Sequence, residues 1–416
     1  MKSEPNPLKP ACTSPAAESR PSISAFPFPR FLIPFSLFTY PFSLLAHPFS
    51  LPLLISLFTL HPSLFISAAE PLPTISPQVK QSVDHAVKWL VEQQKPSGYF
   101  TEQRGEQPVK RGDLPAHSAA MTSLAIMGLT SVGSMPGDPT PEGRAVAKAL
   151  KFMVDYVQPD ENGYLGRSDR SRMYGHGIIS LMIMEMLGMS QDEEVDRKLH
   201  TMAEGAVKLI LQSQKVPKSD SNKGGWRYEP QSSDADMSVT VWQLMALRAA
   251  KNAGLRVPPD AIADAVAYVK RSYRSERDSV GRPRDMAAAF SYEPYGGRQT
   301  FSTTAAGLLS LLASGQYEAP ETIGSSNFLM KSPPAITEPW FFYGNYYYAQ
   351  SMYQRGGDYA ATARRKTEDT LLKNQAADGS WMPRNGNEKS AGPVYATSLA
   401  LLSLSVYHHF LPIYQK

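Results

Sequence analysis

Apolar residues recur at helical spacing along most of this chain, and residues 224–250 show the pattern most clearly. A Gly-Trp turn is followed there by two acids, Asp234 and Asp236, and then by apolar side chains three or four residues apart. These apolar residues are Val239, Trp242, Leu244, Met245 and Leu247. The pattern predicts a buried helix over Met237–Ala253 that is capped by Ser233 or Asp234.

A second pattern ends the more polar segments and has the order aliphatic residue, Gln, Gly and aromatic residue. Leu90–Phe100 and Leu371–Trp381 share it position for position, and Ile210–Trp226 has it with an insertion. More degenerate copies begin at Met153 and Val269, so the aliphatic position returns roughly every 60 residues. Such a period indicates repeated supersecondary units, none of which can bury its apolar face alone.

Each turn is followed by a second segment that is richer in small and apolar residues. We count six: His117–Val132, Tyr174–Met189, Met237–Ala253, Thr300–Ser314, Phe341–Gln354 and Val394–His409. The segments that carry the Gln pattern are more charged on one side, as in His85–Gln94 and Arg364–Gln375. Six pairs of one polar-faced and one apolar helix predict an all-α fold, an (α/α)6 barrel in which six inner helices are wrapped by six outer ones.

Composition excludes several classes of function. The chain has 416 residues and a net charge of +4, with no clustered stripe of Lys and Arg of the kind that nucleic-acid binding needs. Its single cysteine, Cys12, lies near the start of the chain. We therefore expect no disulfide and no thiolate-ligated metal in the folded part, and nothing in the sequence predicts a cofactor.

Residues 1–69 differ from the rest of the chain. They hold about a third of the 35 prolines, and the segment 31–69 contains no Asp, Glu, Lys or Arg. Basic flanks, an apolar core at Leu51–Leu60 and the small residues before Glu70 are typical of an export signal, although an over-extended gene start is an alternative. We expect a cleaved or disordered leader over 1–69, one domain over 70–416, and a periplasmic or extracellular protein, tethered to the membrane if the leader is kept. No later run is long enough to span a bilayer.

The Gln and Trp repeats resemble those of squalene and oxidosqualene cyclases and of protein prenyltransferases, over about residues 80–412. The resemblance implies an α/α toroid in which each Gln caps a helix and bonds to the next repeat while a Trp packs on it. It assigns this structural role to Gln94, Gln214, Gln375, Trp226 and Trp381. The zinc site of the prenyltransferases requires a cysteine that residues 70–416 lack, so no metal is expected.

The acid pair also resembles the Asp-x-Asp-Asp motif of class II terpene cyclases. That resemblance implies Asp236 as the acid that protonates an alkene, with Asp234 beside it as the second catalytic candidate. Met237 stands where the third acid belongs, and the chain has repeats for one toroid only, so both features count against cyclisation. The alternative is structural, with Asp234 capping the helix and Asp236 in its first turn.

Further candidates lie at the starts of the apolar helices or along them. His117 and His176 open two such helices and are expected to point toward the mouth of the ring. Aromatic side chains form the other group, either lining a pocket for an isoprenoid or packing the core; they are Trp242, Tyr343, Tyr346 and Tyr347.

Two classes of function remain open, and the incomplete acid motif beside intact repeats favours the first. The first is an exported, non-catalytic toroid that binds a lipid or isoprenoid, a glycan or a protein partner. The second is an enzyme, either a class II terpene cyclase that uses Asp236 or a carbohydrate-active toroid that uses paired carboxylates such as Asp113 and Asp236. The distance between the carboxylates within the cavity distinguishes a terpene cyclase from a carbohydrate-active enzyme.

Overall fold

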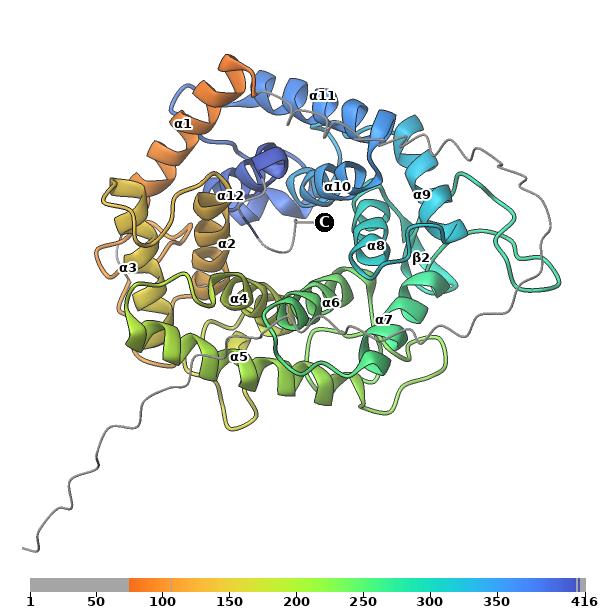
Figure 1. The fold of residues 1–416 in the computed structure, drawn as a ribbon, viewed down its shortest axis with the longest axis horizontal. Helices are drawn as coiled ribbons and strands as arrows, with labels where there is room; N and C mark the ends of the chain where they lie inside the picture. The colour runs from red at the N-terminus through yellow and green to blue at the C-terminus, as the bar shows by residue number, and fades with distance from the viewer. Residues whose placement is uncertain (1–74, 106, 409–410, 412–416) are drawn as a thin grey trace, which may run out of the picture. The chain divides into compact units, whose positions relative to one another are not determined.

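The computed structural model describes residues 75–105, 107–408 and 411. In this part of the chain, twelve α-helices alternate between an outer and an inner ring (Figure 1). The outer helices are α1 (Pro77–Glu92), α3 (Pro141–Tyr156), α5 (Glu193–Gln214), α7 (Pro259–Arg271), α9 (Pro320–Lys331) and α11 (Gly357–Asn374). The inner helices are α2 (Ser118–Ser131), α4 (Arg172–Met186), α6 (Met237–Asn252), α8 (Phe301–Ala313), α10 (Phe341–Arg355) and α12 (Gly392–Leu404). The predicted α/α toroid is confirmed.

The two rings differ in how much of each helix is buried. Every residue of α6 from Met237 to Leu247 is buried, as expected of a helix enclosed on all sides. Helix α1 instead buries one stripe, which includes Val79, Val83 and Leu90, and exposes most of the residues between. The periodicity therefore predicted the rings correctly, and only the last inner helix ends well short of its predicted end at His409.

The three glutamines of the repeats join neighbouring outer helices in the same way. Gln94 Nε2 donates to the carbonyl of Gly98 in its own turn at 2.9 Å and to that of Ala145 on α3 at 2.8 Å. Gln214 repeats this with Gly224 and Ala261 of α7, and Gln375 with Gly379 and Ser82 of α1. The bonding role that the resemblance assigned to these glutamines is confirmed.

The glycine of each turn packs directly on the backbone of the next outer helix. Gly98 has a φ of +103°, and a Cβ added there would lie 2.7 Å from the carbonyl oxygen of Lys148. At Gly224, with a φ of +89°, an added Cβ would overlap the carbonyl of Asp264. Only glycine satisfies both the left-handed backbone and this close approach.

A second repeated contact joins each turn to the inner helix that follows it. The backbone N–H of Trp226 donates to Thr240 Oγ1 at 3.0 Å, and that of Trp381 donates to Thr397 Oγ1 at the same distance. The pairs Phe100–Thr122 and Phe290–Thr304 are equivalent. Because these threonines lie near the starts of inner helices, the inner helices begin where the outer helices end.

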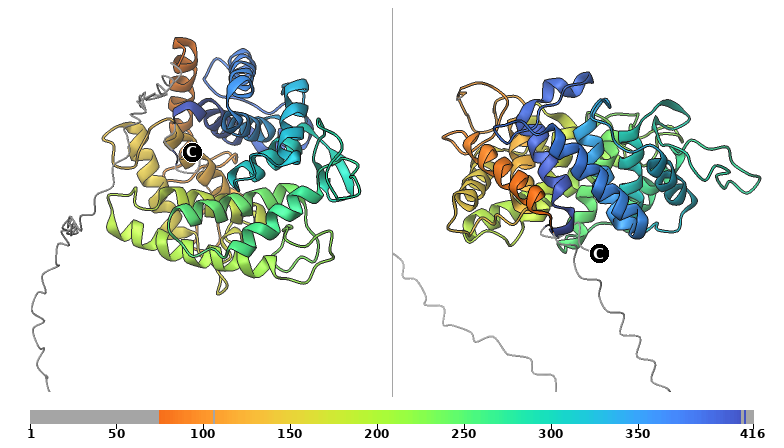
Figure 2. Two further views of the ribbon diagram at one scale, coloured as in Figure 1. Left: turned by 45° about the vertical axis from the view of Figure 1, so that its right-hand side comes forward. Right: turned by 90° about the horizontal axis from the view of Figure 1, so that it is seen from above.

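The strands β1 (Ser291–Glu293) and β2 (Gly296–Gln299) form an antiparallel hairpin between α7 and α8. The connection that contains the hairpin extends beyond the helices of the outer ring (Figure 2). None of the described helices is both long enough and apolar enough to cross a bilayer. The predicted leader and its boundary with the domain at 69–70 lie outside the described residues.

Candidate functional site

The starts of the inner helices lie together on one face, which we call the N-terminal face. Contacts between the starts of different helices show this, since Tyr343 Oη on α10 donates to the carbonyl of Ser238 on α6 at 3.3 Å. Carboxylates that are buried or partly buried cap four of these helices by accepting backbone N–H bonds. The pairs are Glu102 with Tyr395 on α12, Asp169 with Ala120 on α2, Asp236 with Val239 on α6, and Glu388 with Tyr343 on α10.

Burial raises the pKa of all four carboxyl groups, although the N–H donors oppose it. The pKa of Glu102 rises to about 7. Asp169 and Asp236 are fully buried, and Glu388 is nearly so. The N-terminal face therefore carries four acids whose pKa is raised, and they are positioned by helix ends rather than by one another.

Asp236 is the N-cap of α6. Its Oδ1 accepts from Val239 N at 2.9 Å and from Ser238 Oγ at 2.6 Å. Asp234 was expected in this position and Asp236 inside the first turn, so that prediction is wrong by two residues. The reason is that Asp236 N donates to the carbonyl of Trp226 at 3.0 Å, which fixes Asp236 as the last residue before the helix.

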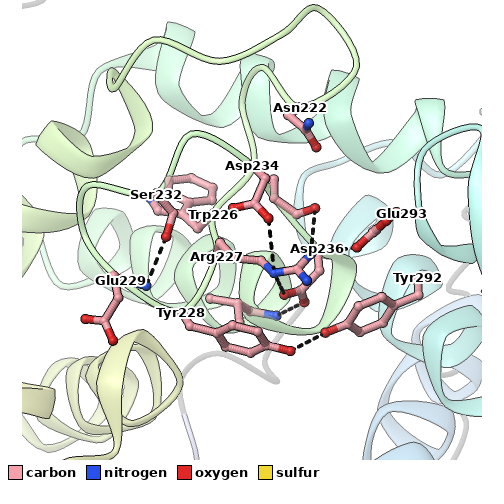
Figure 3. Close-up of polar contacts among 12 residues, drawn as sticks. Asn222, Trp226, Arg227, Tyr228, Glu229, Ser232, Asp234, Asp236, Tyr292 and Glu293 are labelled. Atoms are coloured by element: carbon pink, nitrogen blue, oxygen red, sulfur yellow. Dashed lines mark hydrogen bonds and ion pairs between the residues drawn. The ribbon is translucent and has the colours of Figure 1, made fainter.

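Arg227 connects the two candidate acids. Its Nε lies 3.4 Å from Asp236 Oδ2 and 3.5 Å from Asp234 Oδ2, and its Nη1 lies 2.7 Å from Glu293 Oε1 on the hairpin. Because Asp234 Oδ2 and Asp236 Oδ2 both pair with Arg227 Nε, these two oxygens are at most about 7 Å apart. Figure 3 shows the guanidinium among the three carboxylates.

Two tyrosines complete this group. The hydroxyls of Tyr228 and Tyr292 lie 2.5 Å apart, and the Arg227 guanidinium lies over both rings, 5.0 and 5.7 Å from their centroids (Figure 3). The Tyr292 side chain also lowers the pKa of Asp236, in opposition to its burial. We call the six residues Arg227, Tyr228, Asp234, Asp236, Tyr292 and Glu293 the Arg227 cluster.

The cluster has a buried end and an open end. Asp236 is 0% exposed, whereas the side chains of Asp234 and Glu293 are 56% and 44% exposed. The hairpin tip adds Tyr295, which is 70% exposed. A polar ligand can therefore meet two carboxylates, a guanidinium edge and aromatic rings without entering the core.

Residues with a strained backbone gather at this face. Among the described non-glycine residues, five have a positive φ near 60°, and each is exposed and lies at the start of an inner helix or in the hairpin. They are His117, Arg170, Arg172, Tyr295 and Trp340. Strain of this kind costs about 1–3 kcal/mol per residue and is concentrated at functional sites.

Asp113, the other acid proposed from the sequence, lies elsewhere on this face. Its Oδ1 pairs with Arg170 Nη1 at 3.0 Å, and both side chains are more than half exposed. Asp236 pairs instead with Arg227. The structure thus brings together Asp234 and Asp236, and it gives Asp113 a separate partner.

The two histidines differ from each other. His117 is exposed at the N-cap of α2, where its side chain makes no capping bond. His176 is fully buried inside α4, and its Nδ1 accepts from the N–H of Leu165 at 3.2 Å while Nε2 faces the carbonyl of Ala206 on α5 at 3.4 Å. The expectation that His176 points to the mouth is wrong, because it replaces the turn-binding threonine of the other repeats. Burial lowers its pKa to about 4.

The predicted aromatic pocket residues pack against one another. The rings of Trp242 and Tyr346 are stacked with centroids 6.0 Å apart, and Tyr343 and Tyr347 meet edge to face at 4.8 Å. None of the four is more than 7% exposed. This contact between α6 and α10 forms part of the core beneath the N-terminal face.

Sequence reasoning missed the centre of the cluster. Arg227 follows Trp226 directly, and its position after the Gly-Trp turn was the available signal. Tyr292 and Glu293 stand in a polar segment of the sequence that has no recognisable catalytic spacing. Glu102, Asp169 and Glu388 carry no local signal, because each caps a helix whose bonded N–H lies 45 or more residues away along the chain.

A family model described as the A-macroglobulin TED domain matches residues 65–258, somewhat less than half of the chain. No curated protein matches the chain. The family match and the solved structures of similar fold support a toroid, and they do not support a squalene cyclase in particular.

Solved structures share the fold at low sequence identity. The GH76A α-1,6-mannanase from Salegentibacter sp. HEL1_6 has a TM-score of 0.54 at 9% identity, covering 80% of this chain and 99% of that one. The glycoside hydrolase family 76 mannosidase Bt3792 from Bacteroides thetaiotaomicron VPI-5482 has 0.51 at 9%, covering 80% and 98%. An unsaturated glucuronyl hydrolase specific for heparin has 0.50 at 14%, covering 79% and 96%. These similarities show the fold alone.

Proposed function

We propose that the chain is a carbohydrate-active toroid that binds a glycan at the Arg227 cluster and hydrolyses a glycosidic bond there. One observation carries the proposal: a single guanidinium holds one exposed and one buried carboxylate, Asp234 and Asp236, at most about 7 Å apart. Glycoside hydrolysis uses two carboxyl groups, one of which keeps a proton, at about 5–5.5 Å in retaining enzymes and about 6.5–9.5 Å in inverting ones. The upper limit of about 7 Å is compatible with both spacings.

The two acids have environments that suit different roles. Burial raises the pKa of Asp236, so it is the candidate proton donor. Asp234 faces solvent beside Arg227 and is the candidate that orients and deprotonates a water. Burial thus suits Asp236 to the role of acid, and exposure suits Asp234 to the role of base.

Because Asp236 has no exposed surface, its proton needs a path. We assign this path to Tyr292 and Tyr228, whose hydroxyls lie 2.5 Å apart, because the Tyr292 side chain lowers the pKa of Asp236 and so lies close to that carboxyl group. In this relay the proton of Asp236 moves to Tyr292, that of Tyr292 moves to Tyr228, and that of Tyr228 moves to the leaving oxygen. The water at Asp234 attacks the anomeric carbon as the glycosidic bond breaks, and it gives its proton to Asp234.

The second candidate is a toroid that binds a glycan without hydrolysing it. The anchoring of Asp236 favours it, because Oδ1 is held by Ser238 and Val239 and the residue is fully buried. The same anchoring argues against a terpene cyclase, whose acid must reach an alkene directly. Solvent-facing Asp234 and Glu293 and the exposed ring of Tyr295 at the hairpin tip would serve binding in either case.

The test uses the full chain with α-1,6-linked mannooligosaccharides and with unsaturated glucuronyl disaccharides, the sugars named for proteins of similar fold. We expect release of new reducing ends, lost at least 100-fold in Asp234→Asn and at least tenfold in Tyr228→Phe. The matched control is Asp113→Asn, an exposed carboxylate in a similar ion pair, which should change turnover less than twofold.

Calorimetric titration of the same sugars separates the two candidates. Binding that Asp234→Asn weakens, without any product, selects the non-catalytic toroid. Equal loss of activity in Asp113→Asn, or neither binding nor product with any sugar tested, rejects the Arg227 cluster as a glycan site.

A further inference from the structure

Two adjoining hollows lie along the outer wall, and none of the residues that line them belongs to the Arg227 cluster. The first, of about 520 Å³, lies between α5 and the connection after α6; the second, of about 330 Å³, lies between the end of α5 and the start of α7. Leu211 and Lys215 line both. We propose that this outer groove binds an extended oligoanion, a chain that bears sulfate or phosphate groups.

The cations of the groove are available to a ligand. Lys208, Lys215 and Arg256 line the first hollow, and Lys223 lines the second. All four are exposed, and no ion pair between described residues includes any of them. An anion placed among them would gain attraction without first breaking an existing pair.

Lys208 on α5 and Lys215 at its C-cap share one side of the helix because of their spacing. Glu204, Lys208, Leu211 and Lys215 follow one another at intervals of three or four residues, so they form a single stripe along the hollow. Glu204 is the one acid of this stripe, and it already lies 3.8 Å from His200. The first hollow therefore presents an excess of positive charge.

The fifth cation of the groove has a structural role. Lys218 Nζ donates to the carbonyls of Ser213 at 2.9 Å and of Gln214 and Val216 at 3.4 Å, at the end of α5. These carbonyls are thus satisfied by Lys218, and the helix end does not explain the other lysines. Asp260 and Asp264 line the second hollow and reduce its charge, so the first hollow and the shared Lys215 dominate binding.

The shape favours a chain over a flat surface. Two hollows that share a wall can accommodate successive units of an extended molecule, whereas a membrane surface would meet only the rim. Val207, Leu211 and Leu255 give the first hollow an apolar lining, which suits the carbon skeleton of a substituted sugar. An extended ligand that runs through both hollows would therefore meet apolar side chains and positive charges along its length.

The test measures the affinity of the full chain for a sulfated hexasaccharide and for linear polyphosphate, between 20 and 150 mM salt. The groove variant is Lys208→Gln/Lys215→Gln/Arg256→Gln. The control, Arg365→Gln/Lys366→Gln/Lys373→Gln, removes the same charge from exposed positions on α11. We expect the affinity to fall at least tenfold in the groove variant and less than twofold in the control. The affinity of the groove variant should also depend less on salt, by about two to three released counterions.

Each remaining outcome has a defined meaning. Binding of polyphosphate alone identifies phosphate as the recognised group, and binding of the hexasaccharide alone identifies the sugar chain. Equal losses in the two triple variants, or binding to anionic lipid vesicles but to neither soluble chain, would overturn the proposal. Asp234→Asn removes a negative charge near Lys218 and should not weaken this affinity, so failure at the Arg227 cluster and failure at the groove are separate results.

Discussion

Gln375 and Ser82 exchange two hydrogen bonds although 293 residues separate them. Ser82 Oγ donates to Gln375 Oε1 at 2.7 Å, and Gln375 Nε2 donates to the Ser82 carbonyl at 2.9 Å. They join the end of α11 to α1, and Tyr395 N on α12 similarly donates to Glu102 Oε1 at 2.9 Å. The ring is therefore closed by specific contacts between its first and last repeats.

Replacing Gln375 by Ala should destabilise the protein by about 1–3 kcal/mol. The variant loses both bonds to Ser82 and leaves buried backbone and hydroxyl groups without partners. Equilibrium unfolding in urea measures the loss, with Gln78→Ala as control because Gln78 is exposed on α1. Equal effects of the two substitutions would show that the closing contact adds no stability.

Truncation of Trp381 to Ala should cost about 3–5 kcal/mol. The indole is fully buried, as predicted from the repeat, and its Nε1 donates to the Leu371 carbonyl at 2.9 Å. We expect a lower melting temperature and an almost unchanged glycan affinity of the folded fraction. The neighbouring Met382→Ala serves as the control, since Met382 is 48% exposed. A large loss of affinity at an unchanged melting temperature would contradict a structural role.

The turn glycines allow steric overlap to be separated from backbone strain. Gly224 and Gly254 have similar positive φ values, +89° and +84°, but only at Gly224 would a Cβ overlap a neighbouring carbonyl. Gly254→Ala should therefore cost about 1 kcal/mol through its backbone alone. Gly224→Ala should cost at least about 2 kcal/mol more, because α7 must move away. Similar unfolding free energies for the two variants would show that the turn is not packed as described.

Glu102 should make stability depend on pH. Its pKa is raised by burial to about 7, above that of an unfolded glutamate, so the folded state keeps the proton longer. The contribution is complete below about pH 4.5 and is lost as pH rises through 7. Melting temperatures of the wild type and of Glu102→Gln, measured from pH 4.5 to 8, should show a steeper decline for the wild type. Parallel curves would mean that Glu102 titrates normally.

Much of the fold was predictable because the signals are local. The apolar periodicity located α6 and α8 to within a residue of their ends, and the repeated Gln and Gly positions indicated how the units stack. The Thr240-type contact was present in four repeats but was not recognised, since a threonine near a helix start has several possible roles. His176 takes that place in another repeat, which explains why it was mistaken for a site residue.

The site was less predictable because its contacts are not local. Which aspartate caps α6 depends on the pairing of Asp236 with Trp226 across a nine-residue turn. Arg227 meets Glu293 66 residues later, and Glu102 meets a helix at the far end of the domain. A pattern in neighbouring residues cannot report such pairs, whereas it reports helix faces directly.

Closure between α1 and the last repeat also sets an order of events during synthesis. The partners of Ser82 and Glu102 are made almost 300 residues later, so these side chains stay without them until the final repeat has left the ribosome. Until then, the part of the apolar stripe of α1 that packs on the last repeat is exposed to solvent or covered by another protein. Nascent chains arrested before α11 should consequently be far more sensitive to protease at α1 than chains arrested after α12.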